Sequence, residues 1–408
     1  MMTEGRSNLR QAYRDPGGTR DYAAQRFETP LGALLQRPTA SEVDRRTPPR
    51  VTYWTGAWNP AQEGISKEIQ ALRTGDRVRA PVVAFAPHQP ARIAWQDRVV
   101  TLPVQAWIAL RAVAALIEPA GELTHIFGGH VSWHHLRALG RRPILLTAVI
   151  ESGPTDVRLP ADPAGVVVET DSSVAEWIDA GIPRDRIHIV RPGVPLETFS
   201  PLPRPSGRRF TLLFASTPSD PDDIGPRGIP LLIELARVRP DIDVIVPWRQ
   251  WGDIAGAERV LAGLRPPTNF IVTRDPRIDM RAVHARAHAT VVCFAKGAGK
   301  AVPNFVLEGL ACGRPAIATR GGLSDVLVSH RAGVVIDADV HALSAAVDRL
   351  QADWAGWSER AALLARTEFD LERFRAAYDK LYTELAAPSR ADRSIAHRLR
   401  VPRAASPS

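Results

Sequence analysis

The residues whose types and spacing best suit chemistry gather near the C-terminus, where Asn304 and Glu308 stand four positions apart. Pro303 is typical of a helix start, so the sequence predicts a helix whose first turn spans 303–306. The free backbone N–H groups of that turn would suit an anion. Glu308 would lie on the same helix face as Asn304. Its carboxylate could accept hydrogen bonds from two vicinal hydroxyls, as on a ribose.

Glycines and cations around this stretch indicate further contacts to a phosphate. Gly321 and Gly322 follow the next predicted strand, and glycine lets the backbone approach a phosphate closely. Two of only four lysines, Lys296 and Lys300, lie just before the predicted helix. Arg249 follows a predicted strand and is another candidate cation.

Two other patterns raise the question of a metal, and the sequence predicts none. Four histidines stand close together in the sequence, namely His125, His130, His134 and His135. No glutamate or cysteine accompanies them at the spacing of metal ligands. An Asp-x-Asp pattern, typical of Mn²⁺ or Mg²⁺ sites, recurs at loop-like positions, where chance and capping explain it; the pairs are 220–222, 241–243 and 337–339. The two cysteines, Cys293 and Cys312, are interpreted as core thiols in a reducing compartment.

Length and composition narrow the class of protein. The chain has 408 residues, 45% of them apolar, which predicts about two to three globular domains. No apolar run reaches the roughly 18 residues of a membrane span. The first residues include Glu4, Arg6 and Arg10 without an apolar core, so a secretory signal is not expected.

Of the net charge of +8, all but one unit lies in the two ends of the chain. Residues 1–50 carry nine arginines against six acidic residues, and residues 388–408 carry five against one. The stretch between them is close to neutral and has no basic stripe interleaved with aromatic residues, so nucleic acid binding is not expected. The basic tails could still contact anionic lipid headgroups.

The elements that must position these residues alternate between short apolar runs and helical patterns. This alternation favours an α/β fold with parallel sheets. A proline-rich connector at 200–207 separates two such series of comparable size. Because open α/β sheets bind ligands at the carboxyl ends of their strands, a cleft is expected between the two halves. The apolar stretch 104–117 is predicted to be a helix that packs on a sheet rather than on a membrane.

The stretch 304–325 resembles the signature of the family-4 retaining glycosyltransferases, which have the GT-B architecture of two Rossmann-like domains. Three further segments match that family in the right order, namely 166–172, 187–194 and 228–232. The resemblance covers residues 51–387 at the level of fold, and its motifs are specific in the C-terminal half and loose in the N-terminal half.

Composition and the resemblance together predict five parts of the chain. They are a disordered basic tail (1–48), an N-terminal Rossmann-like acceptor domain (49–203), a C-terminal Rossmann-like nucleotide-sugar-binding domain (204–370), a helix that crosses back to the first domain (371–387) and a second disordered basic tail (388–408).

The resemblance also implies the substrates and the residues that bind them. The donor is a nucleoside-diphosphate sugar, transfer retains the anomeric configuration, and neither a metal nor another cofactor is required. Glu308 matches the glutamate that binds the donor ribose. Arg227 stands where the family usually has a phosphate-binding lysine, and it keeps the positive charge of that position. The other predicted donor-binding positions are Gly64, Arg249, Pro303, Asn304, Phe305, Gly321, Gly322 and Leu323.

The sequence departs from the family pattern at several positions. Lys300 stands where a glutamate contacts hydroxyls of the donor sugar, so a donor with its own carboxylate, such as a uronic acid, becomes a candidate. Ser216 and Thr217 replace a Gly-Arg pair, which removes one phosphate cation. Lys300, Lys296 or Arg249 could replace that cation.

The predicted reaction is transfer of a sugar to an acceptor hydroxyl on a glycan, a lipid-linked molecule or a small molecule. Arg227 and Lys300 would stabilise the departing phosphate, and Glu308 would position the donor. Many family members place a cleft histidine where this chain has Phe127. His130 lies three residues further on and could take its place, so it is the fourth catalytic candidate.

Two rival functions stay open. The same fold could carry a nucleotide-sugar epimerase or a sugar phosphorylase. The altered residues Thr217 and Lys300 also fit a non-catalytic relative that binds a nucleotide or a partner enzyme. The expected location is the cytoplasm, with weak contact of the tails to the inner membrane surface.

Overall fold

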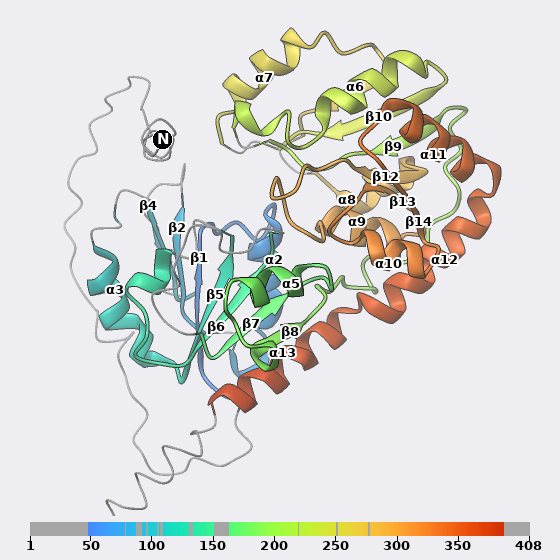
Figure 1. Ribbon diagram of the computed structural model, residues 1–408. Coiled ribbons are helices and arrows are strands. Elements are labelled where there is room, and N and C mark those ends of the chain that lie inside the picture. The colour runs from blue at the N-terminus through green and yellow to red at the C-terminus, as the bar shows by residue number, and fades with distance from the viewer. Residues whose placement is uncertain are drawn as a thin grey trace, which may run out of the picture. The chain divides into compact units, whose positions relative to one another are not determined.

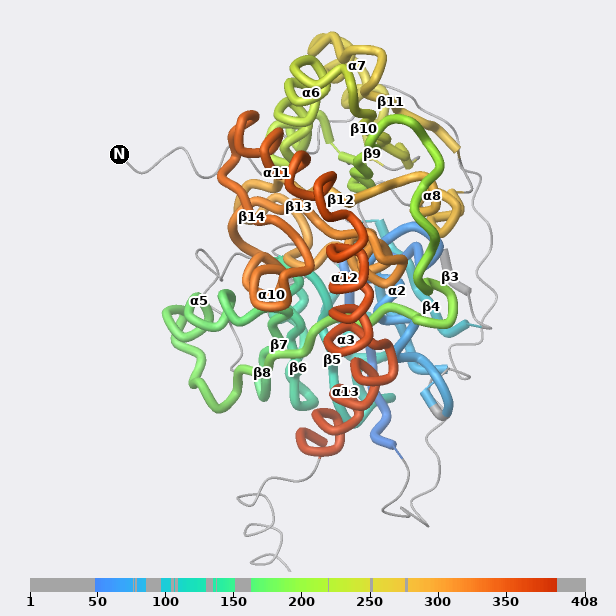
Figure 2. The backbone as a smooth tube through the Cα atoms, turned by 90° about the vertical axis from the view of Figure 1, so that its right-hand side faces the viewer, coloured from blue at the N-terminus to red at the C-terminus, as the bar shows by residue number. Residues whose placement is uncertain are grey.

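The chain forms two β-sheets flanked by helices (Figures 1 and 2). The computed structural model describes residues 48–77, 79–86, 92–94, 97–103, 106, 109–129, 134–150, 163–218, 220–249, 252–275 and 278–386. The predicted tails, 1–48 and 388–408, lie outside the described residues, apart from Pro48.

The N-terminal sheet has eight strands in the order β3-β4-β2-β1-β5-β6-β7-β8. Its neighbouring strands are parallel, except that β3 and β4 pair antiparallel. Its elements are β1 (Val51–Thr55), α2 (Gly64–Leu72), β2 (Val82–Ala86), β3 (Arg92–Ala94), β4 (Val99–Pro103), α3 (Leu110–Ile117), β5 (Leu123–Gly128), β6 (Ile144–Ala148), β7 (Gly165–Val168), α5 (Ser173–Asp179) and β8 (Ile187–Ile189).

The C-terminal sheet has six strands in the order β11-β10-β9-β12-β13-β14, and all its pairs are parallel. Its strands are β9 (Phe210–Leu213), β10 (Ile242–Pro247), β11 (Phe270–Thr273), β12 (Ala289–Val292), β13 (Ala316–Thr319) and β14 (Gly333–Ile336). Its helices are α6 (Ile229–Val238), α7 (Ile254–Gly263), α8 (Met280–Arg286), α9 (Asn304–Ala311), α10 (Ser324–Ser329), α11 (Val340–Ala352) and α12 (Trp354–Glu368), and α13 (Leu371–Ala386) follows them.

The strand and helix order agrees with the predicted α/β class. Short 3-10 helices occur in the connections, at Gly75–Arg77, Glu118–Ala120, His134–Arg137, Arg184–Arg186 and Pro221–Asp223. Below, the N-terminal half means β1 to β8 with α13, and the C-terminal half means β9 to α12.

Alternation of side chains explains how both faces of the N-terminal sheet are covered. On β1, Tyr53 and Trp54 belong to different apolar clusters, because successive residues of a strand point to opposite faces. The face with Trp54 is covered by α3 and α5, and the face with Tyr53 by α2 and α13. The continuous apolar run of β7 is therefore buried on both sides.

The last helix, α13, packs on the N-terminal sheet although it follows the C-terminal sheet in the chain (Figures 1 and 2). Besides apolar contacts it makes a buried polar network. His125 Nδ1 lies 2.7 Å from the Tyr382 hydroxyl, and Thr147 Oγ1 lies 2.9 Å from the Tyr378 hydroxyl. Buried polar groups must be hydrogen-bonded, so this network fixes the position of α13 on the sheet.

The helix predicted over 104–117 is shorter than expected. α3 begins at Leu110, and residues 106 and 109 before it have 3-10 geometry. Leu110, Ala114 and Ile117 recur at helical spacing and are buried in a cluster with the N-terminal strands, as expected for a helix that packs on a sheet. Among the described residues, no helix combines the length and apolar character that crossing a membrane requires.

Candidate functional site

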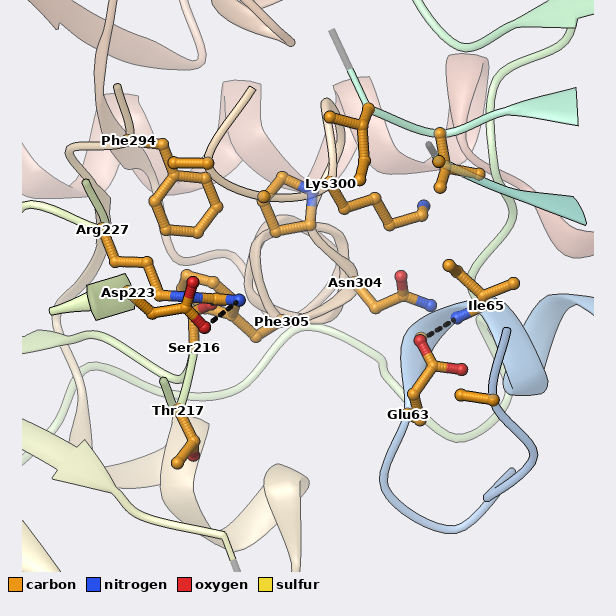
Figure 3. Close-up of a pocket in the computed structure, with 18 of the residues that line it drawn as sticks. Glu63, Ile65, Ser216, Thr217, Asp223, Arg227, Phe294, Lys300, Asn304 and Phe305 are labelled. Carbon is orange, nitrogen blue, oxygen red and sulfur yellow. Dashed lines mark hydrogen bonds and ion pairs between the residues drawn. The ribbon is translucent and has the colours of Figure 1, made fainter. Parts of the chain in front are cut away.

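A pocket of about 530 Å³ lies between the carboxyl ends of strands from both sheets (Figure 3). Its N-terminal wall follows β1, β5 and β6, and its C-terminal wall follows β9, β10 and β12. This is where open parallel sheets place their ligands. The predicted site residues that line it are Gly64, Arg227, Arg249, Lys300, Pro303, Asn304 and Phe305.

Arg227 reaches the pocket from the turn before α6. Its Nη1 donates to Ser216 Oγ at 2.5 Å, and its Nη2 lies 3.4 Å from Asp223 Oδ2. Burial lowers the pKa of Arg227, while Asp223 raises it, and its buried Nε has no hydrogen-bond partner in the described part of the chain. The turn requires Gly228, at φ 76°, because a side chain there would meet the Cys293 carbonyl.

Arg249 enters the pocket directly after β10. Thr217 Oγ1 accepts a hydrogen bond from the Arg249 backbone N–H at 2.9 Å, and the Arg249 guanidinium donates to the Gln62 carbonyl in the N-terminal half. Burial lowers the pKa of Arg249, and the carboxylates of Glu308 and Glu63 raise it. Ser216 and Thr217, which the sequence analysis treats as the loss of a cation, therefore hold the two arginines of the pocket.

The N-terminus of α2 faces the pocket from the opposite side. Glu63 caps it, and its carboxylate accepts hydrogen bonds from the backbone N–H groups of Ile65 at 2.9 Å (Figure 3) and of Ser66 at 2.6 Å. A Cβ atom at Gly64 would lie 2.8 Å from Asn304 Oδ1. Glu63 thus occupies donors that an anion could use, and Gly64 permits α2 to approach α9 closely.

The first turn of α9 forms part of the pocket wall. Pro303 precedes the helix, and no side chain caps it, so its backbone N–H groups keep the partial positive charge of a helix N-terminus. Asn304 Oδ1 is buried and lacks a hydrogen-bond partner among the described residues. The Phe305 ring packs edge-on against Phe214, with 6.2 Å between the ring centroids, and so supports this wall.

Glu308 lies one turn further along α9 and lines a second cavity of about 440 Å³. Its Oε1 pairs with Lys67 Nζ at 3.0 Å. Its Oε2 has no hydrogen-bond partner in the described residues, and His284 Nε2 is 3.9 Å away. Burial raises the pKa of Glu308, but His284 and Lys67 outweigh burial and the pKa is lowered. Asn304 and Lys67 line both cavities, so the two adjoin.

Lys300 lines the pocket, but its ammonium has two carboxylate partners. Lys300 Nζ lies 2.5 Å from Glu68 Oε1 and 2.8 Å from Glu169 Oε1. The three side chains are only 12%, 3% and 2% exposed. The sequence predicted a direct contact of Lys300 to the donor. In the structure, Glu68 and Glu169 already balance the charge of the ammonium.

The predicted glycine loop does not line the main pocket. Gly321, Gly322 and Leu323 line a small cavity of about 30 Å³, next to Lys300. Gly322 has φ 55°, and a Cβ atom there would lie 2.3 Å from the Ala301 carbonyl oxygen. These glycines therefore allow the loop to pack against the backbone that precedes α9.

The histidines of the sequence do not form a metal site in the described part of the chain. His130, a predicted catalytic residue, lies outside the described residues. His125 is buried in the network under α13, and His135 packs edge-on against Trp54. No group of three or more His, Cys, Asp or Glu that could hold a metal is found among the residues the structure describes.

The Asp-x-Asp residues cap helices or pair with arginines. Asp220 caps the 3-10 helix Pro221–Asp223, and Asp339 caps α11, so the capping interpretation is confirmed for both. Asp241 pairs with Arg239 at 2.7 Å. The two cysteines are free and buried, as predicted; they are Cys293 and Cys312.

Four charged residues of the site were missed by the sequence analysis. Three of them, Glu63, Lys67 and Glu68, stand within one stretch at the start of α2. The fourth, Glu169, directly follows the buried strand β7. A charged residue at the carboxyl end of a buried parallel strand is itself a signal of a site. The ion pairs that these residues make across the cleft, with Lys300 or Glu308, have no such signal, because the two members of each pair are more than a hundred residues apart in the sequence.

Comparison with solved structures defines the fold as GT-B. The Anabaena protein HepE, solved with UDP and glucose, matches with a TM-score of 0.64 and 15% identity, over 83% of this chain and 100% of that chain. Sucrose-phosphate synthase from Thermosynechococcus elongatus matches with a TM-score of 0.64 and 17% identity, over 83% and 100% of the two chains. At these identities the likeness shows the fold, and the predicted GT-B architecture is confirmed.

Sequence comparison adds the class of domain. Residues 248–353 match the family described as Glycosyl transferases group 1. Two proteins named D-inositol 3-phosphate glycosyltransferase, from Pseudarthrobacter chlorophenolicus and from Arthrobacter sp., are 31% identical over 248 residues and 30% identical over 228 residues. These matches cover 53% and 48% of this chain and 57% and 51% of the relatives. The chain thus spans about half the length of the curated relatives it matches, and the predicted resemblance to GT-B glycosyltransferases is confirmed.

Proposed function

We propose that this protein is a glycosyltransferase that moves a sugar from a nucleoside-diphosphate sugar to an acceptor hydroxyl, with retention and without a metal ion. One observation carries the proposal. In a GT-B fold, the guanidinium groups of Arg227 and Arg249 line the same pocket as the uncapped first turn of α9. Two cations and a helix N-terminus form an anion site that suits a diphosphate.

Each part of the site suits one part of the donor. The diphosphate would lie between Arg227, Arg249 and the start of α9, which line the same pocket. The ribose hydroxyls would donate to Glu308 Oε2, the buried acceptor without a partner among the described residues. Since HepE was solved with UDP and glucose, a uridine-diphosphate hexose is the first donor to test.

The reaction breaks the bond between the anomeric carbon and the terminal phosphate oxygen, and the electron pair stays on the diphosphate. Arg227 and Arg249 stabilise the negative charge that develops there. The acceptor oxygen bonds to the anomeric carbon on the face that the leaving group occupied, and its proton passes to the leaving phosphate. No side chain of the protein needs to act as a nucleophile.

The acceptor would bind against the N-terminal half. That wall of the pocket combines small and apolar residues with the polar side chains of Gln62, Glu63 and Lys67; the others are Gly56, Ala57, Gly64, Ile65, Gly129, Val149 and Ile150. Such a wall suits a compact, hydroxyl-rich molecule. The names of the curated relatives make D-inositol 3-phosphate the first acceptor to test. A place in the cytoplasm and weak contact with a membrane surface stay predictions.

Proton NMR of the sugar during turnover tests this function. The protein is incubated with UDP-glucose, UDP-N-acetylglucosamine or UDP-glucuronic acid, with and without D-inositol 3-phosphate or a free hexose. We expect consumption of one donor that requires an acceptor, and a product with the anomeric configuration of the donor. Interconversion of the nucleotide sugars without an acceptor would favour the epimerase. Tight nucleotide binding with no turnover of any donor would favour the non-catalytic relative, and either result contradicts the proposal.

A further inference from the structure

We infer that Glu68 and Glu169, in the N-terminal half, are positioning residues that hold the pocket loop 297–303 of the C-terminal half through the Lys300 ammonium. The inference deepens the proposed function, because this loop lines the pocket assigned to the donor. In this inference Lys300 links the loop to the N-terminal half, whereas the sequence predicts that Lys300 contacts the donor directly.

The side-chain geometry joins three separate elements. Glu68 lies in α2, Glu169 follows β7, and Lys300 lies in the loop before α9. The ammonium is within 2.8 Å of both carboxylates, and all three groups are buried. Removing one partner of a buried ion pair leaves an uncompensated charge, which is strongly unfavourable. The loop therefore cannot move away from the N-terminal half without exposing or unpairing these charges.

Backbone contacts hold the same loop in the same place. Glu169 Oε2 accepts a hydrogen bond from the Val302 N–H at 3.1 Å, and Lys300 Nζ donates to the Val302 carbonyl at 2.9 Å. The Ala301 N–H donates to the Val149 carbonyl at 2.7 Å. One carboxylate, Glu169, thus binds both the side chain and the backbone of the loop, which a simple surface ion pair does not do.

The loop needs such support because its own sequence is flexible. It contains Gly297, at φ 79°, and Gly299 within three residues, and glycine loses more conformational freedom on ordering than any other residue. The loop ends at Pro303, where α9 begins. Fixing residues 300–302 therefore fixes the helix N-terminus that is proposed to bind the diphosphate.

Hydrogen–deuterium exchange of the loop tests the inference without any substrate. In Lys300→Met, we expect the amides of Ala301 and Val302 to exchange about tenfold faster or more, because opening of the loop becomes easier. The interior of α9 should keep its exchange rate. Lys380→Met is the control, since it also replaces a lysine by methionine but at an exposed position of α13, where an ion pair contributes little.

A charge swap separates positioning from general damage. In the double variant Lys300→Glu with Glu68→Lys, opposite charges again face one another and Glu169 keeps its hydrogen bond to the Val302 N–H, so exchange of the loop should return towards the wild-type rate. Should Lys300→Met fail to fold, Glu169→Leu carries the same test, because it removes the acceptor of the Val302 amide. Wild-type exchange at 301–302 in a folded Lys300→Met or Glu169→Leu variant would overturn the inference, as would a folded swap variant that restores nothing.

The same variants keep this inference distinct from the proposed function. If the protein binds a nucleoside diphosphate, Lys300→Met should weaken that binding and the charge swap should recover it. If no nucleotide binds, the proposed function fails, while the exchange rates still decide whether the two carboxylates hold the loop.

Discussion

At the scale of single residues, Glu308 shows how burial and pairing prepare a group for a ligand. One carboxylate oxygen is bound to Lys67, and the other is buried with no hydrogen-bond partner among the described residues. A buried hydrogen-bond acceptor without a partner is unfavourable, so we expect a bound ligand to supply the missing donor. His284 and Lys67 keep the pKa of Glu308 low, so the carboxylate stays ionised and its second oxygen can accept a hydrogen bond from a ligand hydroxyl.

We predict that Glu308→Ala weakens nucleotide binding by about 1–3 kcal/mol, the scale for a hydrogen bond to a charged group. Calorimetric titration measures the affinity. Glu258→Ala, at an exposed carboxylate paired with Arg274 outside the pocket, serves as the control and should bind as the wild type does. Equal affinities in a folded Glu308→Ala protein would remove Glu308 from the ribose site.

The pair Glu68 and Glu169 makes stability depend on pH. Burial raises the pKa of Glu169 to about 8, Lys300 lowers it, and the neighbouring Glu68 raises it. An unfolded glutamate ionises near pH 4.5, so between pH 4.5 and about 8 the folded state holds an extra proton. One negative charge on the two carboxyls is enough to balance the single Lys300 ammonium between them. The contribution to stability is therefore complete at low pH and is lost as the pH rises through the folded pKa.

We predict that the free energy of unfolding of the wild type falls, relative to Glu169→Gln, as the pH is raised from 4.5 to about 8. The amide of the variant cannot titrate, so it isolates this carboxyl from the buried histidines, which shift in the opposite direction. Urea denaturation at a series of pH values gives the difference. Two curves that stay parallel across this range would contradict the predicted titration.

At the scale of elements, two helix starts meet at the edge of the pocket, that of α2 in the N-terminal half and that of α9 in the C-terminal half. Glu63 caps the first, and the second is uncapped. The site is therefore asymmetric, with an N-terminal wall that already carries an internal carboxylate and a C-terminal wall that keeps its positive potential for a ligand. The close approach depends on Gly64, which leaves room for Asn304.

We predict that Gly64→Ala weakens nucleotide binding by about tenfold, because a Cβ atom 2.8 Å from Asn304 Oδ1 must displace that side chain at the start of α9. Gly263→Ala is the matched control, since it adds a Cβ in a helix where nothing lies within 4 Å, and it should leave the affinity unchanged. Calorimetry compares the two variants, and equal affinities would show that the contact between α2 and α9 does not shape the site.

The sequence predicted these elements better than it predicted their contacts. The short apolar runs 165–168 and 316–319 form strands, because local pattern decides burial. Pro303 and Asn304 begin a helix as predicted. The ion pairs of Lys67 and Lys300 could not be read in this way, since their partners are distant in sequence and meet only through the tertiary fold. Lys300 illustrates the consequence, because a cation that looked free in the sequence has two buried partners.

At the scale of the described molecule, charged contacts join the two halves around the pocket. Each contact joins a cation of one half to an acceptor of the other. The pairs are Lys67 with Glu308, Lys300 with Glu68 and Glu169, Lys296 with Glu176, and Arg249 with the Gln62 carbonyl. A ligand in the pocket therefore acts on groups of both halves at once. Binding of a nucleotide by Arg249 must compete with the hydrogen bond that Arg249 donates to the Gln62 carbonyl, which couples nucleotide binding to the arrangement of the halves.

The most direct test of the account is calorimetric titration of UDP, GDP and ADP into the wild type, Arg227→Met and Arg209→Met. Arg209 is an exposed arginine paired with Asp243, so its replacement matches the change at Arg227 without touching the pocket. We predict that one nucleotide binds the wild type and Arg209→Met equally, and binds Arg227→Met about tenfold more weakly or worse, because a charged hydrogen bond is lost. No binding of any of the three nucleotides, or equal binding to folded Arg227→Met, would contradict the assignment of this pocket to a nucleoside-diphosphate sugar.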